Sequence, residues 1–344
     1  MRGALAALSA VSAHTEALLQ RHWWQPRSTW LARLLAPLSA LYGFLRVQMA
    51  ARAGPAVPVP VLVVGNVVVG GAGKTPTVIA LVQALQLAGH RPGVVSRGYG
   101  RGDDSVREVH DGDSAAQVGD EPLLIRRRCH VPVWVGRKRS AAARALCHAH
   151  PQVDVIVSDD GLQHVALARQ AELVVFDERG IGNGRLLPAG PLREPWPGAD
   201  AARRRVLYTA GVASTAMPGA LALRALGRAW PLAAWRSGDS SAAVELGSLR
   251  DRPLLAVAGL AAPEKFFGML DGAGLTIVRL PLSDHHAYAT LPWPEGAADV
   301  ITTEKDAVKL VDHALHGTRV WVVPLDLQLP SELIAELVAL LFPS

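Results

Sequence analysis

Residues 61–75 read VLVVGNVVVGGAGKT, an apolar run followed by a glycine-rich loop that ends in Lys-Thr. The run Val61–Val64 is typical of a buried parallel strand. The pattern after it predicts a helix from about Thr75 to Ala88. A strand, a glycine-rich loop and a helix in this order form the context of a phosphate-binding loop. The sequence therefore predicts a P-loop fold.

The loop departs from the strict pattern G-x-x-x-x-G-K-[ST], because Val68 stands where that pattern has glycine. Its glycines still let the backbone approach phosphate oxygens, and the helix that follows directs its positive end at them. We expect Lys74 to reach the β- and γ-phosphates and the Thr75 hydroxyl to bind Mg²⁺. The predicted nucleotide-binding residues are Gly70, Gly71, Ala72, Gly73, Lys74 and Thr75.

A second pair of candidate ligands follows the apolar run at residues 153–157, where Ser158 leads to Asp159 and Asp160. Ligands gather at the carboxyl ends of strands in open α/β sheets, and adjacent carboxylates there can hold Mg²⁺. We predict Asp159 and Asp160 as metal ligands, without deciding which of the two binds directly. The alternative is a pair of turn-forming aspartates before Gly161.

Apolar runs and helical patterns alternate along the chain, which predicts a mostly parallel sheet flanked by helices. A second, smaller α/β lobe starts again at the run Leu254–Ala258 and ends with a helix at about 331–341. The stretch 178–198 is rich in glycine and proline and predicts a long loop, whereas 205–250 carries little pattern. We expect three parts, divided as an N-terminal arm at 1–55, a P-loop core at 56–205 and a C-terminal lobe at 206–344.

Charge is unevenly distributed over the 344 residues. The net charge is +5, and residues 1–55 carry six arginines against the single acid Glu16, so the rest of the chain is balanced. A basic arm on a neutral body favours a membrane surface over nucleic acid, because nucleic-acid binders carry basic residues across their main domain. The two cysteines, Cys129 and Cys147, form no metal-like pair and fit a reducing compartment.

The basic arm also carries apolar residues at helical spacing. Residues 30–46 predict an amphipathic helix, preceded by Trp23 and Trp24. The uncharged run Leu34–Leu45 is shorter than the 17–25 residues, roughly, that span a bilayer. Tryptophans and basic amphipathic helices prefer the headgroup layer. We therefore predict an arm that lies in a membrane surface; the alternative is a helix packed on the protein's own core.

Several strings then identify a family. They are SRGYGR at 96–101, GDEP at 119–122, DDGLQH at 159–164, GNGRLLPAGPLRE at 182–194, DHH at 284–286 and TEKD at 303–306. With the phosphate loop they resemble the tetraacyldisaccharide 4′-kinase family of the lipid A pathway, over about residues 30–325. The resemblance implies ATP-dependent phosphorylation of the 4′-hydroxyl of a tetraacylated glucosamine disaccharide 1-phosphate to give lipid IVA. It also implies ATP and Mg²⁺ as cofactors and a place at the cytoplasmic face of a Gram-negative inner membrane, peripheral or N-terminally anchored.

The same resemblance implies roles for residues outside the loop. Asp120 is the expected base, and His285 its partner in preference to His286, with Lys74 as the third catalytic residue. The disaccharide lipid is expected to contact Arg97, Tyr99, Arg139, Gln163 and His164. From residue type alone, Asp120 would be a helix N-cap before Pro122. Nothing in the sequence indicates an obligatory protein partner.

Two other functions share some of these features. A membrane-associated switch or partitioning-type ATPase would also need a P-loop, tandem aspartates and an amphipathic helix, but such proteins carry a signature lysine where this chain has Val69. A nucleic-acid-dependent ATPase would need a basic body, which the charge distribution does not provide. Phosphate transfer to an added disaccharide lipid distinguishes the kinase from both.

Overall fold

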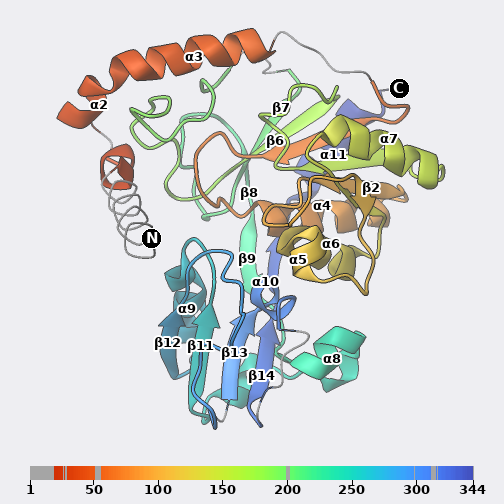
Figure 1. The fold of residues 1–344 in the computed structure, drawn as a ribbon, viewed down its shortest axis with the longest axis vertical. Coiled ribbons are helices and arrows are strands. Elements are labelled where there is room, and N and C mark those ends of the chain that lie inside the picture. The colour runs from red at the N-terminus through yellow and green to blue at the C-terminus, as the bar shows by residue number, and fades with distance from the viewer. Residues whose placement is uncertain are drawn as a thin grey trace, which may run out of the picture. The chain divides into compact units, whose positions relative to one another are not determined.

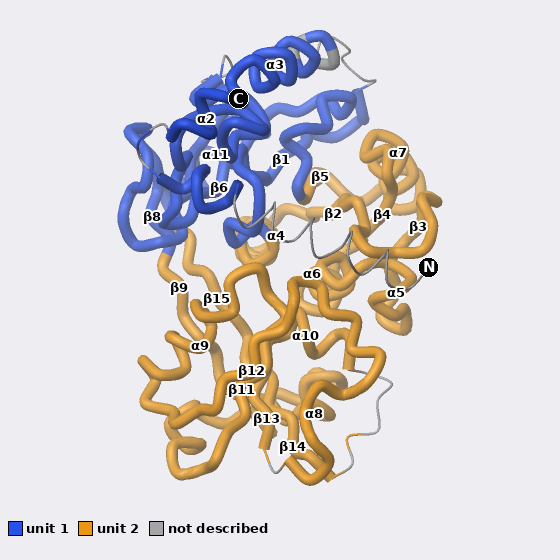
Figure 2. Tube along the Cα trace, turned by 60° about the vertical axis from the view of Figure 1, so that its left-hand side comes forward, with its two compact units in different colours: residues 1–74, 160–222, 330–344 blue, residues 75–159, 223–329 orange. Residues whose placement is uncertain are grey.

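The chain folds as two compact units, each assembled from stretches that are separate in the sequence (Figures 1 and 2). The computed structural model describes residues 19–25, 27, 29–50, 56–198, 202–297, 299–310, 315 and 317–343. The described residues among 1–74, 160–222 and 330–344 form unit 1, and those among 75–159 and 223–329 form unit 2. Both units combine parallel strands with helices, so the predicted α/β class is confirmed.

Unit 1 contains four parallel strands in the order β1-β6-β7-β8. Their bounds are Val61–Gly65 for β1, Ala171–Phe176 for β6, Arg204–Tyr208 for β7 and Ala220–Leu221 for β8. Every residue of β1 and β6 is buried, as expected for apolar runs covered on both faces. Helix α11, Ser331–Leu341, lies against β6 and buries three leucines. The carboxyl end of β1 leads directly into the glycine-rich loop.

The predicted helix over residues 30–46 is two helices, so the expectation of one continuous helix was wrong. Their bounds are Trp30–Leu34 for α2 and Ala36–Ala50 for α3. The break lies at Leu35, and Pro37 falls in the first turn of α3, where its missing N–H removes no helical hydrogen bond. In the part of the chain that the structure describes, no helix is long and apolar enough to cross a membrane.

Unit 2 contains a sheet of four strands in the order β3-β4-β2-β5, in which only β3 runs antiparallel to its neighbour. The strands are β2 Pro92–Ser96, β3 Arg107–Glu108, β4 Val133–Val135 and β5 Val155–Asp159. The helices that accompany them are α4 Lys74–Leu87, α5 Ala115–Val118, α6 Asp120–Cys129 and α7 Arg139–Ala149. The carboxyl ends of β2 and β5 are adjacent, which places Ser96 and Asp159 side by side.

A second sheet in unit 2 has five strands in the order β10-β14-β13-β11-β12, all parallel except β10 (Figure 1). The strands are β10 Trp230–Pro231, β11 Leu254–Ala258, β12 Ile277–Pro281, β13 Asp299–Thr303 and β14 Arg319–Val323. Its helices are α8 Leu232–Ser237, α9 Pro263–Gly272 and α10 Glu304–Ala307. Alternate residues of β11 enter two different apolar clusters, Ala256 with Phe267 and Val257 with Tyr288, so both faces of this sheet are covered.

The stretch that carried little sequence pattern, 205–250, is ordered by short elements. It contains β7, β8, β10 and α8, the strand β9 Leu223–Leu226, and 3₁₀ turns at Ser240–Ala242 and Leu246–Leu249. Strand β9 pairs with β15, Leu325–Gln328, in an antiparallel ribbon. Strands of two to five residues are too short for a periodic signal, which is why the sequence did not reveal them.

Candidate active site

The glycine-rich loop follows β1 in unit 1 and has the backbone of a phosphate-binding loop. Gly70 and Gly73 adopt φ angles of +87° and +84°, which residues other than glycine rarely adopt. A Cβ at Gly65 would lie 2.8 Å from Leu162, so the start of the loop also requires glycine. Helix α4 begins at Lys74, and its positive end therefore starts where the loop finishes.

Charged and polar groups surround Lys74, where the loop meets α4. The Lys74 ammonium donates to Asn66 Oδ1 at 3.2 Å and lies 3.7 Å from Asp160 Oδ1. Arg193 donates to the Asn66 carbonyl at 2.7 Å and to Asp160 Oδ1 at 3.1 Å. We call Asn66, Lys74, Asp160 and Arg193 the phosphate-loop cluster. Two cations share one carboxylate in it, so the cluster can accept further negative charge.

Two predicted lipid contacts lie beside this cluster in the sequence and differ in their surroundings. Gln163 donates through Nε2 to the Asn66 carbonyl and to Glu194 Oε2, both at 3.2 Å, and so touches the cluster. The His164 carbonyl accepts a hydrogen bond from Arg169, and its backbone N–H donates to Gly161. Only Gln163 is therefore joined to the phosphate-loop cluster by these bonds.

The predicted metal ligands are two carboxylates and a hydroxyl, the oxygen ligands that Mg²⁺ prefers. Asp159, at the carboxyl end of β5, is buried and accepts a hydrogen bond from Ser96 Oγ at 2.9 Å. Thr75 is the second residue of α4 and is also buried. Among the described residues, no group of three or more His, Cys, Asp or Glu side chains gathers to hold a metal. Carboxylate and hydroxyl oxygens are ligands that Mg²⁺ combines with nucleotide phosphates and water.

In unit 2, Asp120 and His285 come together from distant parts of the sequence. His285 Nδ1 and Asp120 Oδ2 are 2.9 Å apart, and Asp120 Oδ1 accepts a hydrogen bond from the Glu121 N–H at 2.9 Å. Asp120 is the first residue of α6, and Gly119 occupies the cap position. The carboxylate thus stabilises its own helix terminus and also binds the histidine. His286 instead packs its ring against Tyr288.

Two lysines flank this pair. Lys305 Nζ lies 3.5 Å from His285 Nε2, 3.3 Å from Glu121 Oε1 and 3.2 Å from Asp284 Oδ1. Lys309 Nζ lies 3.7 Å from Asp120 Oδ2. An ammonium group can only donate, so its approach to Nε2 favours a histidine whose Nδ1–H donates to Asp120. We call Asp120, His285, Lys305 and Lys309 the dyad cluster.

The surroundings shift the pKa values of both members of the dyad. Burial opposes ionisation of Asp120, but the hydrogen bond from His285 and the charges of Lys305 and Lys309 outweigh it and lower the pKa of the carboxyl group. The hydrogen bond to Asp120 raises the pKa of His285 against burial and the charge of Lys305. Both shifts favour an ion pair between the Asp120 carboxylate and a protonated His285.

The remaining predicted lipid contacts lie in unit 2. The Tyr99 ring is 61% exposed and its centroid lies 5.1 Å from that of His285, so Tyr99 extends the dyad cluster towards solvent. Arg97 is exposed on the same segment, two residues earlier. Arg139 begins α7, where it is buried and donates to the Arg137 carbonyl at 3.3 Å. The ring contact thus links Tyr99 to the dyad.

Comparison with known proteins decides the family. A family model described as Tetraacyldisaccharide-1-P 4′-kinase matches residues 31–341. The chain belongs to the tetraacyldisaccharide 4′-kinase family. The tetraacyldisaccharide 4′-kinase of Leptothrix cholodnii is 55% identical over 287 residues, covering 82% of each chain. That of Methylibium petroleiphilum is 52% identical over 322 residues, covering 90% of this chain and 89% of its own.

A solved structure agrees with this family assignment. The crystal structure of LpxK from Aquifex aeolicus in complex with ATP matches with a TM-score of 0.73 at 26% sequence identity. The match covers 91% of this chain and 100% of the other. The P-loop α/β fold expected from the sequence is therefore the fold of this kinase family.

The structure adds residues that the sequence did not single out. Asn66 and Arg193 belong to the phosphate-loop cluster, and Lys305 and Lys309 belong to the dyad cluster. Arg193 and Lys305 both lie within family strings, so those strings carried a signal for them. Asn66 lies within the phosphate-loop string itself, whereas nothing local marks Lys309, because its role depends on which side chains the fold brings to it.

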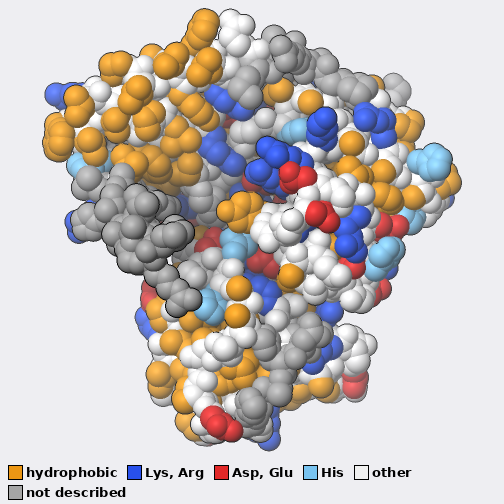
Figure 3. Space-filling model, in the orientation of Figure 1, with side chains coloured by type: hydrophobic (Ala, Val, Ile, Leu, Met, Phe, Trp, Pro, Cys, Tyr) orange, Lys and Arg blue, Asp and Glu red, His pale blue; other side chains and the backbone are white. Residues whose placement is uncertain are grey.

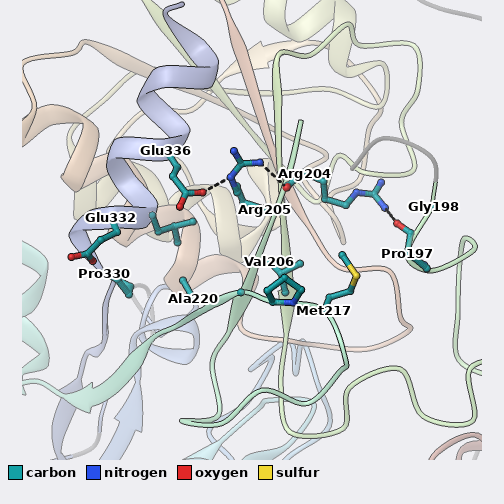
Figure 4. Close-up of a pocket in the computed structure, with 13 residues that line it drawn as sticks. Pro197, Gly198, Arg204, Arg205, Val206, Met217, Ala220, Pro330, Glu332 and Glu336 are labelled. Carbon is teal, nitrogen blue, oxygen red and sulfur yellow. Dashed lines mark hydrogen bonds and ion pairs between the residues drawn. The ribbon is translucent and has the colours of Figure 1, made fainter. Parts of the chain in front are cut away.

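Unit 1 also contains a cavity of about 580 Å³ between β7, β8 and α11 (Figure 4). Its two arginines are already engaged, Arg204 with the Pro197 carbonyl at 2.7 Å and Arg205 with Glu336. None of the predicted site residues lines it. The cavity is thus distinct from the phosphate-loop cluster, and we assign it no part in the family's chemistry.

Proposed function

We propose that this chain transfers the γ-phosphoryl group of ATP to the 4′-hydroxyl of a tetraacylated glucosamine disaccharide 1-phosphate, giving lipid IVA. The observation that carries the proposal is family membership over residues 31–341 together with a complete glycine-rich loop ending in Lys74. Phosphoryl transfer depends on positioning and on stabilising charge, with little covalent work for the protein. The phosphate-loop cluster supplies positive charge and backbone donors for that task.

The dyad cluster supplies the proton chemistry. A sugar hydroxyl is a poor nucleophile, so a base near it assists its attack. Asp120 is that base, and His285, held by Lys305, fixes its orientation and shares the proton. Tyr99, beside His285, is placed to stack on a sugar ring, and Gln163 can bind a substrate hydroxyl. Arg97, Arg139 and His164 complete the proposed contacts to the lipid's sugars and 1-phosphate.

Mg²⁺ would be held by Thr75 and by Asp159 or Asp160. When bound, it neutralises charge on the transferred phosphoryl group. The protein's own contribution is to orient these oxygens. Asp159 is oriented by Ser96, whereas Asp160 lies beside Lys74 and Arg193, which neutralise its charge. The direct ligand in this proposal is therefore Asp159, with Asp160 acting through water.

The N-terminal helices provide a surface for a lipid substrate. Apolar side chains gather over α2 and α3 in Figure 3, and six of them are between 51% and 69% exposed. They are Trp30, Leu34, Leu38, Leu41, Phe44 and Leu45. A contiguous exposed apolar patch with basic neighbours marks an interaction surface. We propose that this patch lies in the cytoplasmic surface of the inner membrane, where the acyl chains of the substrate reside.

The chain's division into parts and its binding partners are also proposed. The three-part division at residues 55 and 205 stays a prediction; it is supported by the second sheet, whose five strands all lie within 206–344. We propose no nucleic-acid partner and no obligatory protein partner, because the excess of basic over acidic residues lies on the arm and the exposed apolar patch lies on that same arm.

The test is a transfer assay with γ-labelled ATP, Mg²⁺ and the disaccharide 1-phosphate lipid in detergent, comparing the parent chain with Asp120→Asn. We expect labelled lipid from the parent and a loss of about 10²- to 10⁴-fold in the variant. Asp111→Asn removes a carboxylate that pairs with Arg126 on the surface of the same unit and serves as the matched control.

The outcomes test the reaction, the role of Asp120 and the membrane surface separately. Labelled lipid with little loss in Asp120→Asn would keep the kinase and reduce Asp120 to a helix-terminal residue. ATP hydrolysis stimulated by bare vesicles, without labelled lipid, would favour the membrane-switch ATPase. For the membrane surface, flotation with anionic vesicles should fall in a Leu38→Ser, Leu41→Ser double variant; unchanged flotation would contradict the proposed patch.

A further inference from the structure

The N-terminal arm and the phosphate loop are joined by a segment that touches both, residues 177–194, which we call the bridging segment. Ser39 Oγ donates to the Leu186 carbonyl at 2.8 Å, and Tyr42 donates to the Arg193 carbonyl at 2.9 Å. Trp23 Nε1 donates to the Pro188 carbonyl at 2.9 Å. The arm is therefore docked on this segment by hydrogen bonds from side chains to backbone, in addition to apolar contact.

The other side of the bridging segment binds the loop backbone. The Arg193 N–H donates to the Val67 carbonyl at 2.7 Å, and the Val69 N–H donates to the Pro191 carbonyl at 2.9 Å. These bonds fix the first half of the loop. Side chains hold the second half: Asn66 Nδ2 donates to the Gly70 carbonyl at 2.9 Å, and Thr209 Oγ1 donates to the Ala72 carbonyl at 3.4 Å.

A third side chain, that of Arg179, reaches the carbonyl between these two, at Gly71. Its Nη2 donates to the Gly71 carbonyl at 2.6 Å, while its Nε donates to the buried Asp177 carboxylate at 2.9 Å. Its guanidinium carbon lies 4.4 Å from the centre of the Trp24 ring, in cation–π geometry. A Cβ at Gly70 would lie 3.4 Å from Arg179 Nη1. Arg179 thus occupies the point where arm, bridging segment and loop meet.

The bond to Gly71 matters because peptide groups are rigid and planar. In a trans peptide the C=O and the following N–H point in opposite directions. Holding the Gly71 carbonyl towards Arg179 therefore sets the direction of the Ala72 N–H, one of the loop's donors. The residues around this peptide include glycines, which rotate more freely than other residues. Without Arg179, the peptide between Gly71 and Ala72 would lose the side chain that holds its own carbonyl, and this donor would be less well oriented before nucleotide binds.

We propose that Arg179 is a positioning residue for the phosphate loop, and that Trp24 of the N-terminal arm sets the position of its guanidinium. Docking of the arm on the bridging segment then controls how well the loop binds nucleotide. This inference rests on the proposed use of the loop for ATP. It links the surface that meets the lipid phase to the loop that holds the phosphates.

The experiment measures binding of Mg²⁺ with a non-hydrolysable ATP analogue by calorimetry, using the full chain. Arg179→Gln removes a charge-assisted hydrogen bond and should raise Kd about 10-fold or more. Trp24→Leu leaves Arg179 present but unsupported and should raise Kd by about two- to fivefold. The double variant should be no weaker than Arg179→Gln alone, because Trp24 acts through Arg179.

Trp30→Leu is the matched control, since Trp30 is 69% exposed on the same arm. It should reduce vesicle flotation and leave the Kd for the analogue unchanged. Arg179→Lys keeps the charge beside Asp177 but cannot donate to Asp177 and Gly71 through separate guanidinium nitrogens. It should give an intermediate Kd, and it replaces Arg179→Gln as the test if that variant does not fold. Thermal unfolding of each variant separates loss of fold from loss of affinity.

Three results would overturn the coupling. They are an unchanged Kd in both Arg179 variants, equal effects of Trp24→Leu and Trp30→Leu, or effects of Trp24→Leu and Arg179→Gln that multiply in the double variant. A parent chain that binds the analogue but phosphorylates no lipid would contradict the proposed acceptor and leave the coupling standing. A parent chain that does not bind the analogue would contradict both.

Discussion

The phosphate-loop cluster and the dyad cluster balance their charges in different ways. In the first, Lys74 and Arg193 share Asp160, which is 37% exposed at its side chain. In the second, Asp120 is nearly buried, and each lysine beside it also contacts another carboxylate. In the phosphate-loop cluster, two positive charges face one carboxylate near solvent. In the dyad cluster, each lysine is balanced by nearby carboxylates. The first is suited to bind a polyanion, and the second to hold a proton at a defined atom.

This difference predicts different kinetic signatures. Changes in the phosphate-loop cluster should alter both nucleotide affinity and rate, because in the proposed function the same charges would contact ATP before and during transfer. Changes in the dyad cluster should alter the rate and its pH dependence while leaving nucleotide affinity nearly constant. The proposed difference would be contradicted by a dyad-cluster variant that loses nucleotide affinity, or by a phosphate-loop-cluster variant that changes only the rate and its pH dependence.

Apart from Asp120→Asn, the largest effect is expected for Lys74→Ala. Removing the ammonium takes away a donor to the phosphates, and kcat/KM should fall about 10²- to 10³-fold with a rise in KM for ATP. Steady-state kinetics with varied ATP checks both values. Lys74→Arg keeps the charge and should recover affinity more than rate. A normal KM for ATP in Lys74→Ala would remove Lys74 from the nucleotide site.

His285→Gln should reduce kcat by about 10²-fold, at the lower end of the range for groups that assist proton transfer. Gln can still donate to Asp120 but cannot take up a proton. His286→Gln is the control, because the His286 ring packs on Tyr288, whereas the His285 ring bonds to Asp120. The two variants should share the parent's KM for ATP. Equal losses in both would contradict the assignment of His285.

The contrast between the clusters also explains what the sequence could predict. The phosphate loop is made of consecutive residues, so its glycines, lysine and threonine are visible as one string. Strands such as β11 and the helix α11 were predicted with their observed bounds, because an apolar run or a helical stripe is a local property. The fold class followed from the alternation of such elements.

Other features depend on the tertiary structure and could not be predicted locally. Asp120 and His285 are 165 residues apart, and only the family resemblance paired them before the structure did. Strand β7 starts with Arg204 and Arg205, which a sequence pattern treats as surface residues. Both arginines are satisfied by acids from other elements, Arg204 by Glu172 and Arg205 by Glu336. A charged strand of this kind becomes predictable only when its partners are known.

A smaller effect is expected at the metal. Ser96→Ala removes the hydroxyl that donates to Asp159 at 2.9 Å and leaves the strand ends otherwise intact. Groups that orient a metal ligand are worth about 10- to 100-fold in metal affinity. We expect the Mg²⁺ concentration for half-maximal activity to rise about 10-fold, with the rate restored at high Mg²⁺. Ser140→Ala, a buried serine on α7, is the control. A loss that Mg²⁺ does not restore would place Ser96 elsewhere in the mechanism.

The smallest effect is expected for Lys305→Met. This variant tests directly whether the charges within the dyad cluster balance one another. The pKa of Lys305 is raised by Glu121, Asp120 and Asp284 against burial, so it stays charged throughout the assay range. Its charge lowers the pKa values of both Asp120 and His285. Removing that charge raises both, and a base with a higher pKa becomes protonated at a higher pH.

The acid limb of the kcat/KM profile should therefore move to higher pH in Lys305→Met. The loss near neutrality should be within about 10-fold, or ~1.4 kcal/mol, and activity should recover as pH rises. Lys305→Arg keeps the charge and should retain the parent profile. A uniform loss at every pH would mean that Lys305 only holds Asp284 and Glu121 in place. A shift of the limb to lower pH would contradict the charge balance of the dyad cluster itself.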